Sequence, residues 1–554
     1  MKILILGGYG VFGGRLATLL SDLAGSELVI CGRDFAKAAA FCSAYQGQAQ
    51  VRPLKLDRND ITSALMAERP DLVVDASGPF QDYGDNRYRV VLACIDFGID
   101  YLDFADGADF VFGVSQFDAA AKAAGIFVLS GVSSFPVLTA AVLHEMAKTM
   151  DITSVTGGIA PSPYAGIGLN VMRAVIGYAG GPVKLLRNGI PTQARGLTES
   201  MRFTIAVPGR LPLKNIRFSL VDVPDLQVIP PQHPTLRDIW LGAGPLPESL
   251  LRILNLFAKA RAAFGLPSLL PLAGLFHKIL NLFKFGEHRG GMFIRASGMR
   301  DGRQIEQSWH LLAEGDDGPY IPSMAIEAII RKAQAGARPD SGARPANRAL
   351  DLADYEALFA QKSIFSAMRS PEPPSAPLYR KVLGAAFDTL PDQVKALHDT
   401  TQTREWAGHA EVRRGTGWIA RAIAGMIGFP QTAAHVPVRV ILSPESGGET
   451  WLRNFGGKTF SSFQTCGTGK NDALLTERFG AIRVALALVV EGECLFLVPR
   501  RWSCLGIPLP GFLLPSGQSF ETERGGDFCF DVEIAVPFIG LIVAYKGTLK
   551  AARL

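Results

Sequence analysis

Three glycines near the N-terminus constrain the fold of this chain more than any other feature. Gly8, Gly10 and Gly13 form a Gly-x-Gly-x-x-Gly motif that follows an apolar run at residues 2–6 and precedes a helical pattern. Between a strand and a helix, this spacing is typical of a loop that binds a dinucleotide. Gly8 is then expected to make the tight turn, Gly10 to let the backbone approach a pyrophosphate, and Gly13 to let the helix pack on the sheet.

The first 150 residues alternate short apolar runs with helical patterns. The runs read as strands at 2–6, 28–31, 51–56, 72–76, 101–104 and 127–130. Connections of this length join parallel strands, so we expect an α/β domain with a Rossmann-type, doubly wound parallel sheet. The helix that follows the glycine motif is predicted to point its N-terminus, with Val11 and Phe12, at the phosphates.

The second strand ends in Cys31-Gly-Arg33-Asp34, where an NAD enzyme usually carries an acid for the ribose hydroxyls. The guanidinium of Arg33 would instead pair with a 2′-phosphate, and Asp34 is expected to cap the next helix. NADP(H) is therefore favoured over NAD(H). The alternative for Arg33 is a solvated surface charge.

The carboxyl ends of the strands should face the ligand crevice. On the loop after the fourth strand, Ser77, Gly78 and Pro79 are expected beside the nicotinamide. The polar groups close enough to act on a substrate, each also able to serve as a turn former or cap, are Asp82, Tyr83, Asp106, Ser133 and Ser134. The predicted cofactor site consists of Gly8, Gly10, Val11, Phe12, Gly13, Arg33, Ser77, Gly78 and Pro79.

Residues 151–365 contain longer strand-like runs separated by turns, and this pattern predicts an α+β substrate or dimerisation domain with an antiparallel sheet. An Asp301-Gly302 pair between two alternating runs indicates a hairpin. Closely spaced prolines occur at 337–345 and 370–377, and the second stretch predicts a linker over 366–379. Beyond it, residues 380–554 read as a separate strand-rich α+β domain, an antiparallel meander over two helices.

An insertion at 248–289 repeats Ile-Leu-Asn-Leu-Phe at 253–257 and 279–283, and it holds six basic residues against two acidic ones. Its apolar residues have helical spacing, first at Leu250, Ile253, Leu254 and Phe257. Basic amphipathic helices of this kind lie in membrane interfaces. The alternative, that both stripes pack against the substrate domain or a second subunit, stays open.

Composition narrows the function classes. Fifty-six Lys+Arg against 51 Asp+Glu leave a net charge of +5, too small over 554 residues to predict nucleic-acid binding. Seven cysteines without a Cys-x-x-Cys pair and eight scattered histidines predict no disulfide framework and no metal site. No run reaches the roughly 20 apolar residues that span a bilayer, and no export signal is evident. We expect a cytoplasmic protein, or one peripheral at the inner face of a membrane.

These motifs together resemble the saccharopine dehydrogenase-like oxidoreductases, closely over residues 1–150 and loosely to about 360. The resemblance is carried by Gly7-Gly-Tyr-Gly-Val-Phe-Gly13, Gly78-Pro-Phe80, Tyr83-Gly84, Val90-Val-Leu-Ala-Cys94, Gly98-Ile-Asp-Tyr-Leu-Asp103 and Gly131-Val-Ser-Ser-Phe-Pro136. It implies nicotinamide-dependent redox chemistry on amino-acid conjugates, polyamine precursors or lipid-linked substrates. Asp106-Gly107 replaces the Gly-Glu usual in the family, a departure from the pattern of enzymes that act on amino-acid conjugates.

Residues from about 380 to 554 resemble an uncharacterised domain found fused to such reductases, with no known activity. The matching residues are His398, Gly428-Phe-Pro430, Trp451, Arg453, Glu477-Arg-Phe-Gly480, Gly506-Ile-Pro-Leu-Pro510, Phe528, Phe530 and Asp531. We expect an NADP(H)-dependent oxidoreductase that acts on a small or lipid-like substrate between its first two domains, and a homodimer is one assembly open to it. The alternatives are a nucleotide-binding sensor or scaffold, and an apolar-ligand carrier without turnover.

Overall fold

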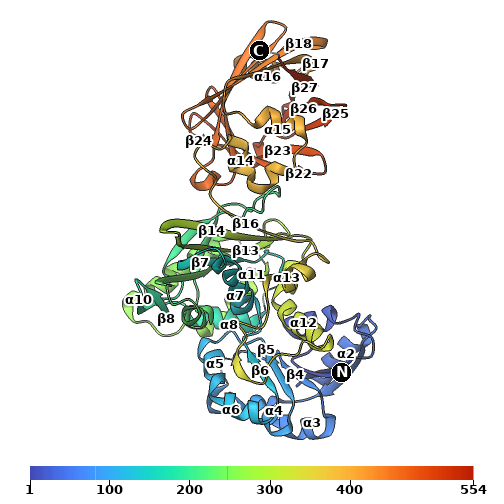
Figure 1. The fold of residues 1–554 in the computed structure, drawn as a ribbon, viewed down its shortest axis with the longest axis vertical. Helices are drawn as coiled ribbons and strands as arrows, with labels where there is room; N and C mark the ends of the chain where they lie inside the picture. The colour runs from blue at the N-terminus through green and yellow to red at the C-terminus, as the bar shows by residue number, and fades with distance from the viewer. Residues whose placement is uncertain (81–82, 167, 246, 283, 553–554) are drawn as a thin grey trace. The chain divides into compact units, whose positions relative to one another are not determined.

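The structure is a computed structural model that describes residues 1–80, 83–166, 168–245, 247–282 and 284–552 (Figure 1). It divides into two compact units. The first consists of Met1–Phe203 and Ile216–Ser366, and the second of Thr204–Asn215 and Ala367–Leu554. The second unit therefore includes a short excursion from the middle of the chain. In that excursion, the carbonyl of Gly209 accepts a hydrogen bond from the N–H of Val490 at 2.8 Å.

The first unit contains a sheet of seven strands in the order β15-β6-β5-β4-β1-β2-β3, with parallel pairing throughout. The strands are β1 (Lys2–Leu6), β2 (Glu27–Gly32), β3 (Gln50–Lys55), β4 (Leu72–Asp75), β5 (Asp100–Asp103), β6 (Phe127–Ser130) and β15 (Gly342–Pro345). The predicted doubly wound sheet is confirmed. Its strand order reverses between β1 and β4, and ligands bind at such a switch point, outside the carboxyl ends of the strands.

The seventh strand of this sheet was not predicted. β15 lies inside the proline-rich stretch 337–345, yet it pairs with β6 from Gly342 opposite Phe127 onward. Ala343 is buried, and its N–H donates to Asp118 Oδ1 at 3.0 Å. Proline is tolerated on an edge strand, where its missing N–H removes no ladder bond. The prolines therefore mark a sheet edge here and not a linker.

Helices from both ends of the first unit cover the sheet. The early ones are α1 (Val11–Leu19), α2 (Phe35–Ala44), α3 (Ile61–Glu68) and α4 (Arg89–Phe97). A much later helix, α12 (Ile321–Gln334), lies against α1. Ser323 Oγ donates to the carbonyl of Phe12 at 3.2 Å, and Arg331 Nη2 donates to the carbonyl of Leu19 at 3.0 Å. These contacts fix α1, the helix that begins within the glycine motif.

The second sheet of this unit has the order β10-β11-β12-β7-β13-β14-β16. Its strands are β7 (Asp151–Ala160), β10 (Ser200–Phe203), β11 (Ile216–Leu220), β12 (Asp238–Ala243), β13 (Gly290–Arg300), β14 (Arg303–Ala313) and β16 (Ile364–Arg369). The hairpin at Asp301-Gly302 is confirmed, with φ of +49° and +74°. The predicted antiparallel pairing is found for β10–β11, β11–β12, β13–β14 and β13–β7, but β12 pairs with β7 in parallel after a long crossover, so the sheet is mixed.

The insertion forms the predicted two helices, α10 (Glu248–Phe264) and α11 (Ala273–Leu282). The face of α10 that packs on the first unit carries Leu251, Leu254 and Ala258, whereas Ile253 and Phe257 are exposed. The predicted stripe therefore mixes two faces, because α10 is apolar over a wide arc. Phe283 lies outside the described residues. Within the described ranges, no helix is long and apolar enough to cross a membrane.

The second unit is built on an antiparallel sheet that closes on itself. The order is β22-β21-β20-β19-β18-β17-β27-β26-β25-β23-β24, and β22 also pairs with β23, so β24 alone stays outside the ring. The predicted antiparallel meander thus closes into a barrel. Its strands are β17 (Arg404–Arg414), β18 (Ala433–Glu445), β19 (Gly448–Phe455), β20 (Lys458–Cys466), β21 (Leu475–Phe479), β22 (Ile482–Glu491), β23 (Cys494–Cys504), β24 (Ile507–Pro508), β25 (Ser519–Arg524), β26 (Asp527–Val536) and β27 (Gly540–Ala551).

Three helices accompany the barrel: α14 (Leu378–Leu383), α15 (Asp392–His398) and α16 (Trp418–Ile427). The first two lie at the start of this domain, before its strands. Their buried residues, among them Tyr379 and Leu397, join the barrel interior in one apolar core. This core is separate from the apolar core of the parallel sheet in the first unit.

Candidate active site

In the glycine-rich turn between β1 and α1, the backbone segments lie so close together that side chains at several positions would clash with them. Gly7 has a φ of +70°, so Gly7 makes the tight turn that we assigned to Gly8. A Cβ on Gly8 would lie 2.9 Å from the carbonyl oxygen of Ile5, and one on Gly13 would lie 2.5 Å from that of Gly7. Gly8 is therefore needed for packing on the sheet, and Gly13 for the approach of α1 to the turn, as predicted.

The start of α1 presents backbone N–H groups that no side chain caps. Its N-cap residue is Gly10, which has no side chain to cap the helix, and Gly10 is exposed. The peptide N–H groups of the first turn are thus available to an anion, which the helix dipole also favours. Val11 is 39% exposed beside them, whereas the ring of Phe12 stacks on Phe104 with centroids 5.5 Å apart.

The carboxyl end of β2 presents a basic group. Arg33 is exposed there, while the Asp34 carboxylate accepts a hydrogen bond from Lys37 N–H at 3.2 Å and caps α2, as predicted. Tyr9 Oη accepts from the N–H of Asp34 at 3.2 Å. A Cβ on Gly32 would lie 2.2 Å from the ring of Tyr9, so the tyrosine needs a glycine at the end of the strand.

A buried carboxylate shapes the loop after β4. Asp75 Oδ1 accepts from Ser77 N–H at 3.0 Å and from Ser77 Oγ at 2.5 Å, and Ser77 Oγ lies 2.7 Å from Tyr83 Oη. Arg58 lies 3.7 Å from the Tyr83 ring centre. Burial raises the pKa of Asp75 and, with the charge of Asp75, that of Tyr83. Ser77 and Tyr83 thus hold each other in place, and Asn170 Nδ2 donates to the carbonyl of Gly78 at 3.0 Å.

Asp103, like Asp75, is a buried carboxylate that accepts hydrogen bonds from neighbouring loops, here those after β5 and β6. Its Oδ1 accepts from Gly131 N–H at 2.7 Å, Ala105 N–H at 2.9 Å and Ser130 Oγ at 3.1 Å. Complete burial raises the pKa of Asp103 to about 7. The Asp103 carboxyl is therefore a structural group that fixes the backbone of the loop after β5 and of the loop after β6.

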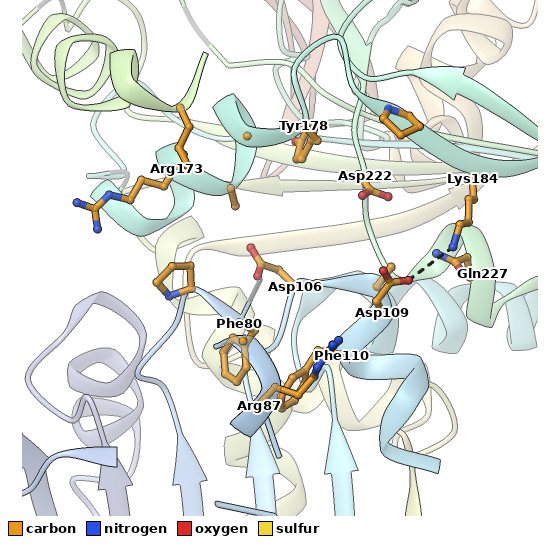
Figure 2. A pocket seen from close by; sticks show the side chains of 18 of the residues that line it. Phe80, Arg87, Asp106, Asp109, Phe110, Arg173, Tyr178, Lys184, Asp222 and Gln227 are labelled. Carbon is orange, nitrogen blue, oxygen red and sulfur yellow. Dashed lines mark ion pairs between the residues drawn. The ribbon is translucent and has the colours of Figure 1, made fainter. Parts of the chain in front are cut away.

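A polar cavity of about 460 Å³ opens at these carboxyl ends (Figure 2). Pro79 and Phe80 line it from the loop after β4, and Asp106 from the loop after β5. The opposite wall comes from α8 (Leu169–Tyr178), the hairpin of β8 (Pro182–Arg187) and β9 (Ile190–Arg195), and the loop after β11. In Figure 2, Asp106 lies on the side of the parallel sheet, and Tyr178 and Asp222 lie on the opposite wall.

Titratable groups are concentrated in this cavity. Burial, with the charge of Asp109 and a smaller effect of Asp106, raises the pKa of Asp222 to about 6. Burial, with Asp222 and Asp106, also raises the pKa of Tyr178. Lys184 Nζ lies 3.7 Å from Asp109 Oδ1, and Arg173 adds a second cation to the lining. A carboxyl with a pKa near neutrality in a cleft is suited to exchange protons with a substrate.

The predicted catalytic candidates do not all line the same cavity. Asp106 lines the polar cavity, whereas the Tyr83 hydroxyl is held at Ser77. Ser134 is buried and lines a second cavity of about 170 Å³ together with Val11 and Phe12, and Ser133 is half-buried just before it. Asp82 lies outside the described residues.

Sequence reasoning missed Asp222, Tyr178, Arg173 and Lys184, which belong to no motif. The one available signal is at Asp222, a charge between Val221 and Val223 just beyond the end of β11. Within the described ranges, no group of three or more His, Cys, Asp or Glu side chains could hold a metal ion.

Comparison with known proteins gives one family match. Residues 390–549, which cover most of the barrel unit, match the model of a domain of unknown function, DUF4166. No functionally curated protein matches the chain.

Among solved structures, the chain is similar to an amine dehydrogenase from Mycobacterium smegmatis, with 12% identity, coverage of 63% of this chain and 95% of that one, and a TM-score of 0.33. The WlbA (WbpB) dehydrogenase from Thermus thermophilus, in complex with NAD and alpha-ketoglutarate, shares 12% identity over 62% of this chain and 90% of its own, with a TM-score of 0.28. A Gfo/Idh/MocA family oxidoreductase from Vibrio cholerae shares 11% identity over 61% and 91%, with a TM-score of 0.28.

Proposed function

We propose that this protein is an NADP(H)-dependent oxidoreductase of the saccharopine dehydrogenase-like type. One observation carries the proposal: the polar cavity opens at the carboxyl ends of β4 and β5, next to the switch point where the glycine turn and α1 begin. In doubly wound sheets, the cofactor and the substrate meet along this edge. Asp106 and Asp222 then face each other across the cavity in which the substrate binds.

The residues for the cofactor follow from the same edge. The first turn of α1 after Gly10 would bind the pyrophosphate, and Arg33 would bind a 2′-phosphate through charge-assisted hydrogen bonds. The loop of Ser77, Gly78 and Pro79 would border the nicotinamide. When bound, the nicotinamide supplies hydride transfer, while the protein supplies binding, orientation and exclusion of water.

Asp222 is the proposed acid–base residue. With a pKa raised to about 6, its carboxylate can accept a proton from a substrate hydroxyl or amino group at neutral pH and return it in the reverse direction. The Tyr178 phenol stays protonated, because burial and the two carboxylates raise its pKa, so it can donate a hydrogen bond to a substrate oxygen. Asp106 is proposed to orient the polar part of the substrate.

The lining of the cavity supports a small or lipid-like substrate with a polar reactive group. Arg173, Lys184 and the acidic groups would bind that polar part. Leu270, from the insertion between α10 and α11, also lines the cavity and is 39% exposed. An apolar tail could therefore extend from the reactive group along the insertion.

The experiment is NADPH turnover with fractionated metabolite extracts, preceded by calorimetric titration of NADPH and NADH. The wild type should bind NADPH and oxidise it with at least one fraction. Asp222→Asn should keep NADPH affinity and lose turnover by about 10²-fold or more, as expected for an acid–base residue. Asp301→Asn, in the exposed β13–β14 turn, is the matched control and should retain full activity.

Each negative result has its own meaning. A folded protein that binds neither NADPH nor NADH would refute the dinucleotide site. NADPH binding without turnover in any fraction would favour a nucleotide-binding sensor. Full activity of Asp222→Asn would remove the assigned role of Asp222 and leave the oxidoreductase proposal to rest on the cofactor site.

A further inference from the structure

The barrel of the second unit encloses a cavity of about 260 Å³ whose wall is mostly hydrocarbon. Side chains from nearly every strand of the ring contribute to this wall, with Phe455, Leu486 and Phe528 among the buried ones. Closed barrels of this kind are a common place for a single apolar ligand. This cavity plays no part in the redox site proposed for the first unit.

One region of the cavity wall is polar, and its charges are already used. Glu477 Oε1 accepts hydrogen bonds from Ser462 Oγ at 2.6 Å, from Gln464 Nε2 at 3.1 Å and from Arg453 Nη2 at 3.1 Å. The guanidinium of Arg453 also lies 4.7 Å from the ring centre of Trp451. Arg453, the cation among the described lining residues, is therefore neutralised by Glu477 before any ligand arrives.

Further carboxylates make this region unfavourable for an anion. Glu521 lines the cavity, and its Oε2 lies 2.5 Å from His398 Nε2. Behind the wall, Glu449 is buried and accepts from Trp451 Nε1 at 2.8 Å and from Thr400 Oγ1 at 2.7 Å. Three acidic side chains, Glu477, Glu521 and Glu533, thus line the cavity against one paired arginine, and Glu449 lies behind the wall. A ligand carboxylate or phosphate would meet repulsion and no unpaired cation.

Two polar atoms of this wall have no hydrogen-bond partner within the described part of the chain. They are Oη of Tyr379 and Oε1 of Gln464, whose residues are 0% and 1% exposed and line the cavity. The bond from Gln464 Nε2 to Glu477 fixes the amide orientation, so Oε1 is a free acceptor. Buried polar groups are nearly always paired in proteins, which points to a ligand that completes these two.

We propose that the barrel binds an uncharged amphiphile, whose apolar chain fills the hydrocarbon cavity and whose hydroxyl group donates to Gln464 Oε1 and accepts from Tyr379 Oη. A hydroxyl is the simplest group that both donates and accepts. Burial, together with Glu521, Glu449 and Glu477, raises the pKa of Tyr379 well above its ordinary value, so the phenol keeps its proton for this bond.

The surface around the cavity suits a ligand of this kind. Ile423, Met426 and Ile427 of α16 line the cavity, and Met426 is 78% exposed. On the same helix Trp418 is 75% exposed, and Phe538, beside the lining residue Ile539, is 93% exposed. Large apolar side chains in water at the edge of an apolar cavity offer a water-poor path for a chain to enter.

The test uses the full-length protein and displacement of the neutral fluorescent probe aminoanthracene by decanol, decanoate or decylamine. Decanol should displace the probe at a concentration at least about tenfold lower than decanoate, which carries the same chain with an anionic head. Tyr379→Phe should weaken decanol about fivefold, the loss of one hydrogen bond, with unchanged affinity for the probe. Because this hydroxyl has no protein partner, thermal stability without ligand should not fall.

A pair of wall variants locates the binding. Leu486→Phe places extra volume inside the barrel and should abolish probe binding in a protein that still melts cooperatively. Leu452→Phe, on the exposed face of β19, should bind as the wild type does. The proposal is overturned if the wild type does not bind the probe, if decanoate or decylamine competes as well as decanol, or if Tyr379→Phe leaves decanol affinity unchanged.

Discussion

Asp75 and Asp103 lie opposite each other at the ends of adjacent parallel strands, and both are completely buried. Each has one oxygen that accepts hydrogen bonds from the loop that follows its strand. The second oxygen of Asp75 lies 3.6 Å from Arg58 Nε, whereas that of Asp103 has no hydrogen-bond partner in the described chain. Burial raises the pKa of both carboxyls. The loops that border the proposed crevice are therefore fixed by a pair of acids whose ionisation is costly.

Replacing Asp103 with asparagine should flatten the pH dependence of stability. Burial raises the pKa of Asp103 from its ordinary 3.8 to about 7. Between these values, the folded protein holds a proton that the unfolded chain has released. The wild-type free energy of unfolding should therefore fall as pH rises through this window, by on the order of 3 kcal/mol from this group. Asp103→Asn keeps an acceptor for Gly131 N–H and cannot ionise. Urea denaturation across the window checks this, and equal slopes in both proteins would contradict it.

Arg33→Asp should narrow or reverse the preference for NADPH. The wild-type guanidinium can pair with a 2′-phosphate, whereas a carboxylate repels the phosphate and can bind ribose hydroxyls. Calorimetric titration should show at least about tenfold weaker NADPH binding by the variant, with NADH affinity unchanged or higher. Lys37→Asp, one helical turn further into α2, is a charge-matched control and should have a smaller effect. Equal affinities of the wild type for NADPH and NADH would refute the assignment of Arg33.

Gly10→Val should abolish dinucleotide binding without unfolding the protein. A Cβ at Gly10 would lie 2.9 Å from the carbonyl oxygen of Gly7, so the turn must shift locally, and a branched side chain there would also occupy the space in which the backbone meets a pyrophosphate. Gly274→Val is the matched control, because Gly274 lies in helix α11 with no atom within 4 Å of its Cβ position. Intact NADPH binding in folded Gly10→Val would count decisively against a site at the glycine turn.

Limited proteolysis should cut the chain at 370–377 and spare 342–345. The first stretch is mostly exposed, whereas the second is strand β15, paired to β6. The two pieces should still elute together in gel filtration, because residues 204–215 belong to the compact barrel unit although they precede the cut. They should separate in denaturant. A C-terminal piece that elutes alone, or cleavage within β15, would contradict this organisation.

We propose that the insertion lies in a membrane interface, with its second apolar face in contact with lipid. Leu256, Phe264 and Leu282 are 68%, 78% and 76% exposed, and Lys259 and Lys278 are exposed among them. The protein should co-sediment with anionic vesicles, and Leu256→Glu with Phe264→Glu should leave it in the supernatant. Met66→Glu, on exposed helix α3, is the control. Wild type that stays in the supernatant at low salt refutes the proposal, and a concentration-dependent dimer would assign the face to a second subunit.

The sequence predicts the early sheet well because its signals are local. Each apolar run is bounded by glycine or a charge, and the motif Gly8–Gly13 places α1 directly. The error at Gly7 arose because a motif names glycines without showing which one has a positive φ. The strand β15 was missed for a different reason: four residues that include a proline become a strand only because β6 offers an open edge.

The barrel and the cavity depended on contacts that no local pattern encodes. β17 is rich in charge, yet Trp406, Ala410 and Val412 alternate inward, and this strand closes the ring between β18 and β27. Burial is the main cause of the raised pKa values of Asp222 and Tyr178, with neighbouring carboxylates adding to it, and these groups come together only because α8 and the loop after β11 lie across the cavity from the loop after β5. Such convergence of distant segments is invisible in a single sequence.

Strand β15 also bears on how the protein is made. β6 ends at Ser130, and the strand that covers its outer edge begins only at Gly342. At roughly 5–20 residues per second, synthesis of the intervening chain takes on the order of ten seconds or more, during which the ribosome-bound sheet has an uncovered edge. Uncovered sheet edges can pair with other chains, so a chaperone that binds the nascent chain during this interval would prevent aggregation at this edge. A gene fragment cut at residue 150, the boundary that the sequence predicts, leaves out a strand of its own sheet.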